Sequence, residues 1–233
     1  MAPFYTFSPK TTTISFTWPK EITGLERIAL SAQGDLQRIL SAFFARPIVL
    51  ALIYSNTFTK RGETLEPLSL PNSNAVAAAS PEVPIVQNRQ VHLQCGGKVV
   101  CVATSTVKIS SPRCAHLFLE EKYGIGQLFS KLGATPSFEL LDVGIGGHND
   151  MEKGMGGSQL WRRYRLSGPE IECEILEVFA SREMFSQGET WLEGRGQILT
   201  SSRPRTSNAL LWFAFLSMVL FEVYMYTTRS SRC

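Results

Sequence analysis

The chain has 233 residues and a formal net charge of +3, with 44% hydrophobic and 18% charged residues. This length suits one α+β domain with tails better than two full domains, and the hydrophobic share excludes general disorder. Because the charge is small and scattered, it offers no basic surface for nucleic acid, and we expect no nucleic-acid partner.

The first half of the chain predicts two helices and a strand. Hydrophobic residues at helical spacing indicate helices over Ile22–Ala29 and Gly34–Phe43. The apolar run Ile48–Tyr54 follows and predicts a buried strand. Residues 57–84 are rich in proline, serine and asparagine, which predicts a loop excursion.

A hairpin and further helices are predicted next. Residues Gln87–Lys108 form two alternating runs joined at Gly96-Gly97, a pair that tolerates the positive φ of a tight turn. Ser111–Tyr123 and Ile125–Leu132 have helical patterns, and Gly133 ends the second.

The remaining elements complete an antiparallel sheet. Phe138–Val143 predicts a strand, and a glycine-rich loop continues to Gly157. Leu160–Leu166 and Ile171–Phe179 predict a second hairpin. Consecutive hairpins with grouped helices favour an α+β fold, an antiparallel sheet with its helices on one face.

The expected organisation is an N-terminal tail over residues 1–20, one domain over 21–195 and a linker over 196–208. The segment Ala209–Tyr226 is apolar on all sides except for Glu222, and it is just long enough for a transmembrane helix. It predicts a tail anchor that holds the domain at the cytoplasmic side of a membrane. A helix packed on the domain and a mispredicted end of the gene remain the alternatives.

The cysteines and histidines predict no metal site. Five cysteines at positions 95, 101, 114, 173 and 233 contain no CxxC pair, which argues against a disulfide framework and suits a reducing compartment. His92, His116 and His148 lack metal-ligand spacing. His148, in the glycine-rich loop, is kept as a candidate for the rim of a pocket.

Two charged residues lie in the apolar phase of their predicted strands. Arg89 alternates in phase with Val91 and Leu93, and Glu177 alternates with Ile175 and Phe179. A buried charge needs a partner or a ligand. The residues alone leave three alternatives: a structural Arg89–Glu177 ion pair, a bulge that turns one of them outward, or a pocket. In the pocket, Arg89 would hold a carboxylate and Glu177, its pKa raised by burial, would donate a proton.

Several segments, taken in order, resemble chorismate lyase and its relatives. They are residues 88–93, 124–129, 160–166 and 175–179. The helix from Gly34 to Leu40 also resembles the N-terminal helical flap of that family. The resemblance covers most of residues 25–185 and depends on the ordered set, because no single motif is specific.

This resemblance implies a ligand cavity between the sheet and helical flaps. It implies that Arg89 binds the ring carboxylate, that Ile125 offers a backbone N–H to the ligand, and that Glu177 is the acid at the ring's hydroxyl end. The family reaction eliminates pyruvate from chorismate to give 4-hydroxybenzoate and needs no cofactor. The implied partner is therefore a small carboxylated aromatic or pre-aromatic compound.

Two alternative functions remain open. One is a module that binds a small aromatic acid without chemistry, as ligand-sensing relatives do. The other is an enzyme of secondary metabolism that runs a related elimination or cyclisation. The sequence favours catalysis on one ground: a pure binder of anions gains nothing from a second buried acid, here Glu177, beside its ligand.

Overall fold

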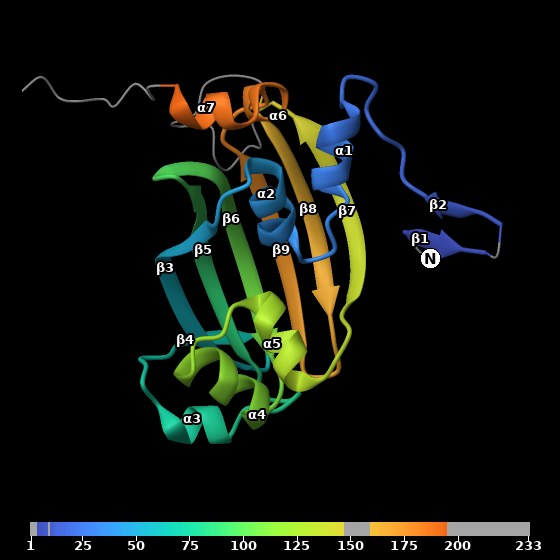
Figure 1. The fold of residues 1–233 in the computed structure, drawn as a ribbon. Helices are drawn as coiled ribbons and strands as arrows, with labels where there is room; N and C mark the ends of the chain where they lie inside the picture. Colours follow the sequence, from blue (N-terminus) through green and yellow to red (C-terminus); the bar gives the residue numbers. More distant parts are fainter. Residues whose placement is uncertain (1–3, 9, 147–158, 195–233) are drawn as a thin grey trace, which may run out of the picture. The chain divides into compact units, whose positions relative to one another are not determined.

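A seven-stranded antiparallel sheet in the order β4-β3-β5-β6-β9-β8-β7 forms the centre of the fold (Figure 1). The computed structural model describes residues 4–8, 10–146 and 159–194, all within one structural unit, Met1–Gly194. The strands of the sheet are β3 (Ile48–Arg61), β4 (Thr64–Pro67), β5 (Ile85–Cys95), β6 (Lys98–Ile109), β7 (Ser137–Ile145), β8 (Leu160–Ser167) and β9 (Ile171–Phe179).

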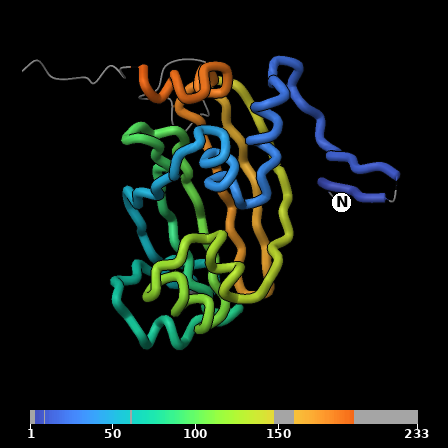
Figure 2. Tube along the Cα trace, viewed as in Figure 1, coloured from blue at the N-terminus to red at the C-terminus, as the bar shows by residue number. Residues whose placement is uncertain are grey.

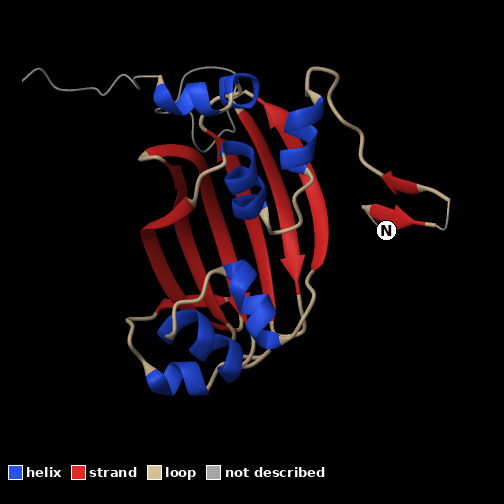
Figure 3. Cartoon of the chain, viewed as in Figure 1, coloured by secondary structure: helices blue, strands red, loops and turns tan. Residues whose placement is uncertain are grey.

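The described helices confirm the α+β class. They are α1 (Gly24–Leu30), α2 (Leu36–Phe44), α3 (Ser73–Ala77), α4 (Pro112–Ala115) with the π-helix η1 (His116–Glu120), α5 (Ile125–Leu132), α6 (Glu183–Gln187) and α7 (Glu189–Glu193). Figure 3 shows α2 and α5 over the same face of the sheet. We call this the helix-covered face.

Helices α1 and α2 form where the sequence predicts them. The Thr23 side chain and Glu26 close a capping box at the start of α1, and Asp35 is the N-cap of α2. Leu36, Leu40 and Phe44 then follow at four-residue steps and are buried. This stripe fixes α2 against the sheet.

The hairpin β5–β6 is confirmed, with one change in its register. Gly96 and Gly97 have φ of 56° and 83°, which glycine adopts without strain. A bulge between Leu93 and Gln94 then shifts the pairing, so Arg89 lies opposite Ser105. A two-residue turn at Gly96-Gly97 without a bulge predicts Arg89 opposite Thr104, and the structure corrects this pairing by one residue.

The buried strand predicted over Ile48–Tyr54 is a strand, but it is not buried. The exposed fractions of Val49, Leu50, Leu52 and Ile53 are 58%, 45%, 58% and 49%. The reason is topology: β4 pairs only with the end of β3, from Phe58 onward, so the first part of β3 is an edge. A continuous apolar sequence is compatible with a central strand and with an edge strand, so the sequence does not show whether the strand is buried.

The loop excursion predicted over residues 57–84 is also largely wrong. Strand β3 continues to Arg61, turns into β4, and the segment then forms α3. Asn72 caps α3 through its side chain, which accepts from the Ala75 backbone. The predicted N-terminal tail likewise contains a hairpin, β1 (Tyr5–Phe7) with β2 (Thr12–Ile14).

Strands β8 and β9 alternate as predicted. On the face opposite the helices, Arg163 and Arg165 lie beside Glu172 and Glu174 and form a ladder of partly exposed ion pairs. Such pairs contribute little to stability. The basic run in β8 therefore has one solvated face, as its sequence indicates.

Three predictions fall outside the described residues: the glycine-rich loop from residue 147 onward, with His148, the linker over 196–208, and the candidate membrane segment 209–226. The first residues predicted for that loop, Gly144 and Ile145, belong to β7. Among the helices that the structure describes, none combines the length and the apolar character needed to cross a membrane.

Candidate functional site

Two adjoining cavities lie between the helix-covered face and the helices. The inner cavity, of about 140 Å³, is lined by Arg89, Ser105, Ile125, Tyr164, Ile175 and Glu177, among others. The outer cavity, of about 820 Å³, includes Leu50, Leu52, Leu70, Arg89, Phe118 and Lys122 in its lining. Both cavities share Leu50, Arg89, Val91, Gly124 and Gln127. Arg89 therefore stands at their junction.

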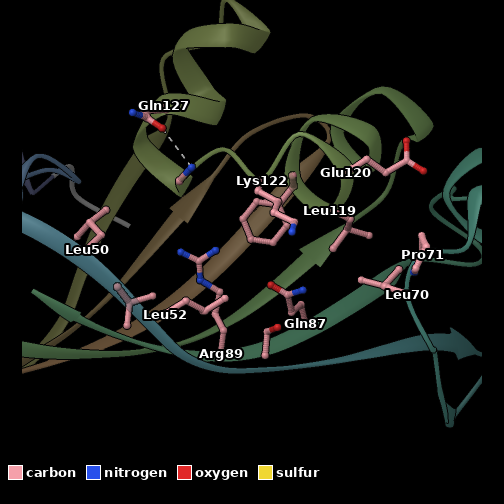
Figure 4. Close-up of a pocket in the computed structure, with 14 residues that line it drawn as sticks. Leu50, Leu52, Leu70, Pro71, Gln87, Arg89, Leu119, Glu120, Lys122 and Gln127 are labelled. Carbon is pink, nitrogen blue, oxygen red and sulfur yellow. Dashed lines mark hydrogen bonds between the residues drawn. The ribbon is translucent and has the colours of Figure 1, made fainter.

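Arg89 comes from the middle of β5 and reaches into the outer cavity (Figure 4). Its guanidinium carbon is 5.1 Å from the centre of the Phe118 ring, close enough for a cation–π contact. Its Nε is buried and has no hydrogen-bond partner. No acidic side chain of the described residues lies within ion-pair distance of Arg89. Burial lowers the pKa of Arg89, yet arginine keeps its charge at neutral pH.

Helix N-termini form the roof of the inner cavity. Helix α5 begins at Ile125, whose N–H has no acceptor within the helix. The preceding N–H, that of Gly124, donates to Gln127 Oε1 at 3.3 Å (Figure 4). Gly126 approaches the carbonyl of Gly34, before α2, so closely that a Cβ there would lie 3.4 Å from the oxygen. Figure 2 shows these segments, distant in sequence, over the same strands.

Glu177 is buried in a hydrogen-bonded group with Arg162 and Tyr164. Arg162 Nε donates to Glu177 Oε2 at 2.6 Å, and the Tyr164 hydroxyl donates to Oε1 at 2.9 Å. Burial raises the pKa of Tyr164 well above its usual range, and the charge of Glu177 adds to this, so the phenol keeps its proton. Both carboxyl oxygens of Glu177 thus accept hydrogen bonds.

Arg162 also ties the roof to the sheet. It is fully buried, and its Nη1 donates to the backbone carbonyls of Leu30 at 2.9 Å and Ala32 at 2.6 Å. Burial alone would lower its pKa, but the charge of Glu177, the interactions with Tyr164 and Cys101 and the hydrogen bond to Glu177 together outweigh this and raise it. Arg162 therefore links the floor at Glu177 to the segment between α1 and α2.

Arg162 is a site residue that was not predicted, although the sequence contains a signal for it. In β8 it alternates in phase with Leu160, Tyr164 and Leu166, all buried. The same period-two rule that selected Arg89 and Glu177 selects Arg162. The neighbouring Arg163 and Arg165, both on the solvated face, masked it.

The three predicted site residues meet at one place without forming an ion pair among themselves. Arg89, Ile125 and Glu177 all line the inner cavity. The alternative of an Arg89–Glu177 ion pair is wrong, because Glu177 pairs with Arg162, and strand β6 lies between β5 and β9. The outward-turning bulge is wrong as well, since both residues line the cavity.

The described cysteines and histidines supply no metal centre. Cys95, Cys101, Cys114 and Cys173 are buried and unpaired. Burial raises the pKa of Cys114 to about 12 and that of Cys101 well above its usual range, which disfavours their thiolates. Within the ranges that the structure describes, no three metal-ligating side chains gather.

His116 on η1 gives a prediction about pH. Its Nδ1 bonds Glu120 and its Nε2 lies 3.1 Å from Glu121, and the Glu120 bond is the main reason that its pKa is raised. A raised pKa adds stability that is fully present below about pH 6.5 and is lost as pH rises through the folded value. We expect His116→Gln to lower the melting temperature at pH 5.5, and by less at pH 8.5.

Thermal unfolding followed by circular dichroism at several pH values measures this difference. Glu120→Gln removes the main cause of the raised His116 pKa. It should therefore lose most of the stability that the unmodified protein has at pH 5.5 and lacks at pH 8.5. A His116→Gln deficit that is equal at both pH values would show that the imidazolium contributes nothing.

Comparison with models of known protein families gives no match, and comparison with curated proteins gives none either.

Proposed function

We propose that the chain binds a small organic acid whose carboxylate is held by Arg89. One observation carries this proposal: Arg89 is a partly buried cation at the junction of two cavities, without an acidic partner among the described residues. A desolvated guanidinium without an anion is unfavourable, and a bidentate carboxylate would satisfy it.

The charges around the inner cavity favour an anion. The N-terminal ends of α2 and α5 line it, and helix N-termini carry partial positive charge. The negative charge of Glu177 is balanced by Arg162 at 2.6 Å. Because the charge of Glu177 is already balanced, the charge of Arg89 gives the described lining of the inner cavity a net positive charge.

The inner cavity has room for about one ring. Its volume is about 140 Å³, and an apolar cavity of roughly 150 Å³ holds benzene. Val91, Ala103 and Ile175 supply apolar contacts, while Tyr164 and Glu177 supply polar atoms at β8 and β9. A ring with a carboxylate at Arg89 and a hydroxyl near Glu177, such as 4-hydroxybenzoate, matches this distribution.

A second candidate is the elimination of pyruvate from chorismate, or a related reaction of a carboxylated ring. It is favoured because Arg89, Ile125 and Glu177, the residues that the resemblance implies, line one cavity. In that reaction the ether C–O bond breaks and its electron pair leaves with the enolate, the ring carbon that bears the hydroxyl loses its proton so that the ring becomes aromatic, and one proton passes to the enolate, which becomes pyruvate. Because Glu177 accepts at both oxygens, it would place the ring hydroxyl rather than supply the proton.

The experiment that tests the proposal is titration calorimetry of the full chain with 4-hydroxybenzoate, alongside Arg89→Met. We expect binding by the unmodified protein and a loss of roughly 30-fold or more in affinity for the variant, because a charge-assisted pair in a desolvated site contributes about 2–5 kcal/mol. The matched control is Arg163→Met, an arginine on the opposite face, which should keep the affinity.

Incubation with chorismate, with pyruvate and 4-hydroxybenzoate followed over time, separates the two candidates. Binding without pyruvate release supports the binding module, and release supports the enzyme. Release that persists in Glu177→Gln would show that Glu177 is not the proton donor. Failure to bind any benzoate, or unchanged affinity in Arg89→Met, would contradict the proposal.

A further inference from the structure

We infer that the acid bound at Arg89 carries an apolar substituent, which lies in the outer cavity and leads out at the edge of β3. This inference depends on the proposed function. It starts from a mismatch of size: the inner cavity of about 140 Å³ takes one ring, and the outer cavity of about 820 Å³ remains. A ligand of ring size alone would leave most of this space to water.

The outer cavity is lined by apolar side chains both in its buried part and at its exposed mouth. Phe118 and Leu119 belong to η1 and are buried, with exposed fractions of 4% and 8%. At the mouth, the exposed fractions of Leu50, Leu52 and Leu70 are 45%, 58% and 39%. Figure 4 shows these leucines on both sides of Arg89, on different segments of the chain. Exposed apolar side chains that gather around a cavity indicate a binding surface.

The charges of the lining favour an uncharged substituent. Among the described residues that line the outer cavity, the ionisable ones are Arg89, Glu120 and Lys122. Glu120 is bonded to His116. Arg89 would bind the carboxylate, so Lys122, an exposed side chain, is the remaining cation. A single exposed lysine binds an anion weakly, and the rest of this lining includes Leu50, Leu52, Leu70 and Leu119. The outer cavity therefore favours an uncharged group.

The geometry also limits where the substituent is attached. Both cavities meet at Arg89, so a group that enters the outer cavity leaves the ring on the side of the carboxylate. A group at the opposite end of the ring would point toward Tyr164 and Glu177, which line the inner cavity on β8 and β9. The ligand class is therefore a ring acid with an alkyl or alkoxy group in the 3-position, rather than the 4-position.

A second copy of the chain is the competing occupant of this edge. Antiparallel pairing of β3 with its equivalent would cover Leu50 and Leu52. It would not use Leu70, which lies between β4 and α3 and lines the same cavity. Three leucines from two segments that converge on one cavity favour a ligand.

The experiment measures the affinity of the full chain for 3-alkoxybenzoates from methoxy to hexyloxy, with the isomeric 4-alkoxybenzoates as chemical controls. Each added methylene should tighten binding of the 3-series by about 2–4-fold, because burial of a methylene group is favourable by that factor. The 4-series should show no such gain. Leu52→Ser and Leu70→Ser should flatten the slope of the 3-series.

Val49→Ser is the matched control, because Val49 is as exposed as Leu52 but lies in the opposite phase of β3. It should leave the slope unchanged. A protein that binds 4-hydroxybenzoate through Arg89 yet shows no gain along the 3-series would overturn this inference and leave the proposed function intact. A dimer that Leu52→Ser converts to a monomer, with a flat 3-series, would assign the edge to self-association.

Discussion

Replacing Arg162 with methionine is expected to lower the free energy of unfolding by about 3–5 kcal/mol, as for other buried ion pairs that lose one partner. The change leaves the Glu177 carboxylate buried without its cation, and it removes donors from the carbonyls of Leu30 and Ala32. Methionine fills a similar volume, so the loss reports on charge and hydrogen bonding more than on packing. Urea unfolding followed by circular dichroism measures it.

Arg163→Met is the matched control for this prediction. Arg163 is the next residue, with 44% of its side chain exposed, and its ion pair with Glu174 spans 3.7 Å. We expect an effect below about 1 kcal/mol. The double variant Arg162→Met/Glu177→Met should be more stable than Arg162→Met, because it no longer buries an unpaired carboxylate. Equal losses at Arg162 and Arg163 would show that the buried pair does not stabilise the fold.

The pairing of Arg162 with Glu177 also changes the argument about catalysis. The sequence favoured an enzyme because an unpaired acid beside an anion would be pointless in a pure binder. In the structure Glu177 is balanced by Arg162 and accepts from Tyr164. Its presence is therefore compatible with simple binding, and Arg89 becomes the residue on which the function depends.

The orientation of individual strands could be predicted because it depends on local alternation. The phases of β5 and β9 placed Arg89 and Glu177 on the helix-covered face, and the structure confirms both. The partner of Glu177 lies on β8, where two partly exposed arginines, Arg163 and Arg165, stand beside the buried Arg162 and obscure its phase. Applied to β8 as well, the rule of alternation identifies Arg162 from the sequence alone.

Other features depend on pairings between distant segments and could not be read locally. The exposure of Leu50 and Leu52 follows from the position of β3 beside the short β4, which no composition pattern specifies. The bulge at Leu93 consists of one extra residue in β6, Val100, which the two-residue turn at Gly96-Gly97 does not specify. The inner and outer cavities arise only once α5 and η1 lie over β3 and β5.

A second large loss of stability is expected when Arg182 is replaced with methionine. Glu26 in α1 is only 2% exposed, and Arg182 donates to both of its oxygens, at 2.6 and 2.9 Å. Without Arg182, the buried carboxylate keeps the Thr23 backbone N–H, at 2.7 Å, but no cation. We expect a loss of about 3 kcal/mol, the lower end for a buried pair, because 26% of the Arg182 side chain is exposed.

The pH dependence of this loss identifies its cause. Burial alone would raise the pKa of Glu26, but the hydrogen bonds from Arg182 and Thr23 outweigh it and hold the pKa below its usual range. A lowered pKa gives stability that is present above the unfolded value of about 4.3 and disappears as pH falls through the folded value. The gap between the unmodified protein and Arg182→Met should therefore be constant near neutrality and close below about pH 4. Urea unfolding from pH 3 to 7 measures the gap, with Arg38→Met, whose pair with Asp35 is exposed, as the control. A gap that persists undiminished at pH 3 would mean that Arg182 stabilises α1 by packing rather than through Glu26.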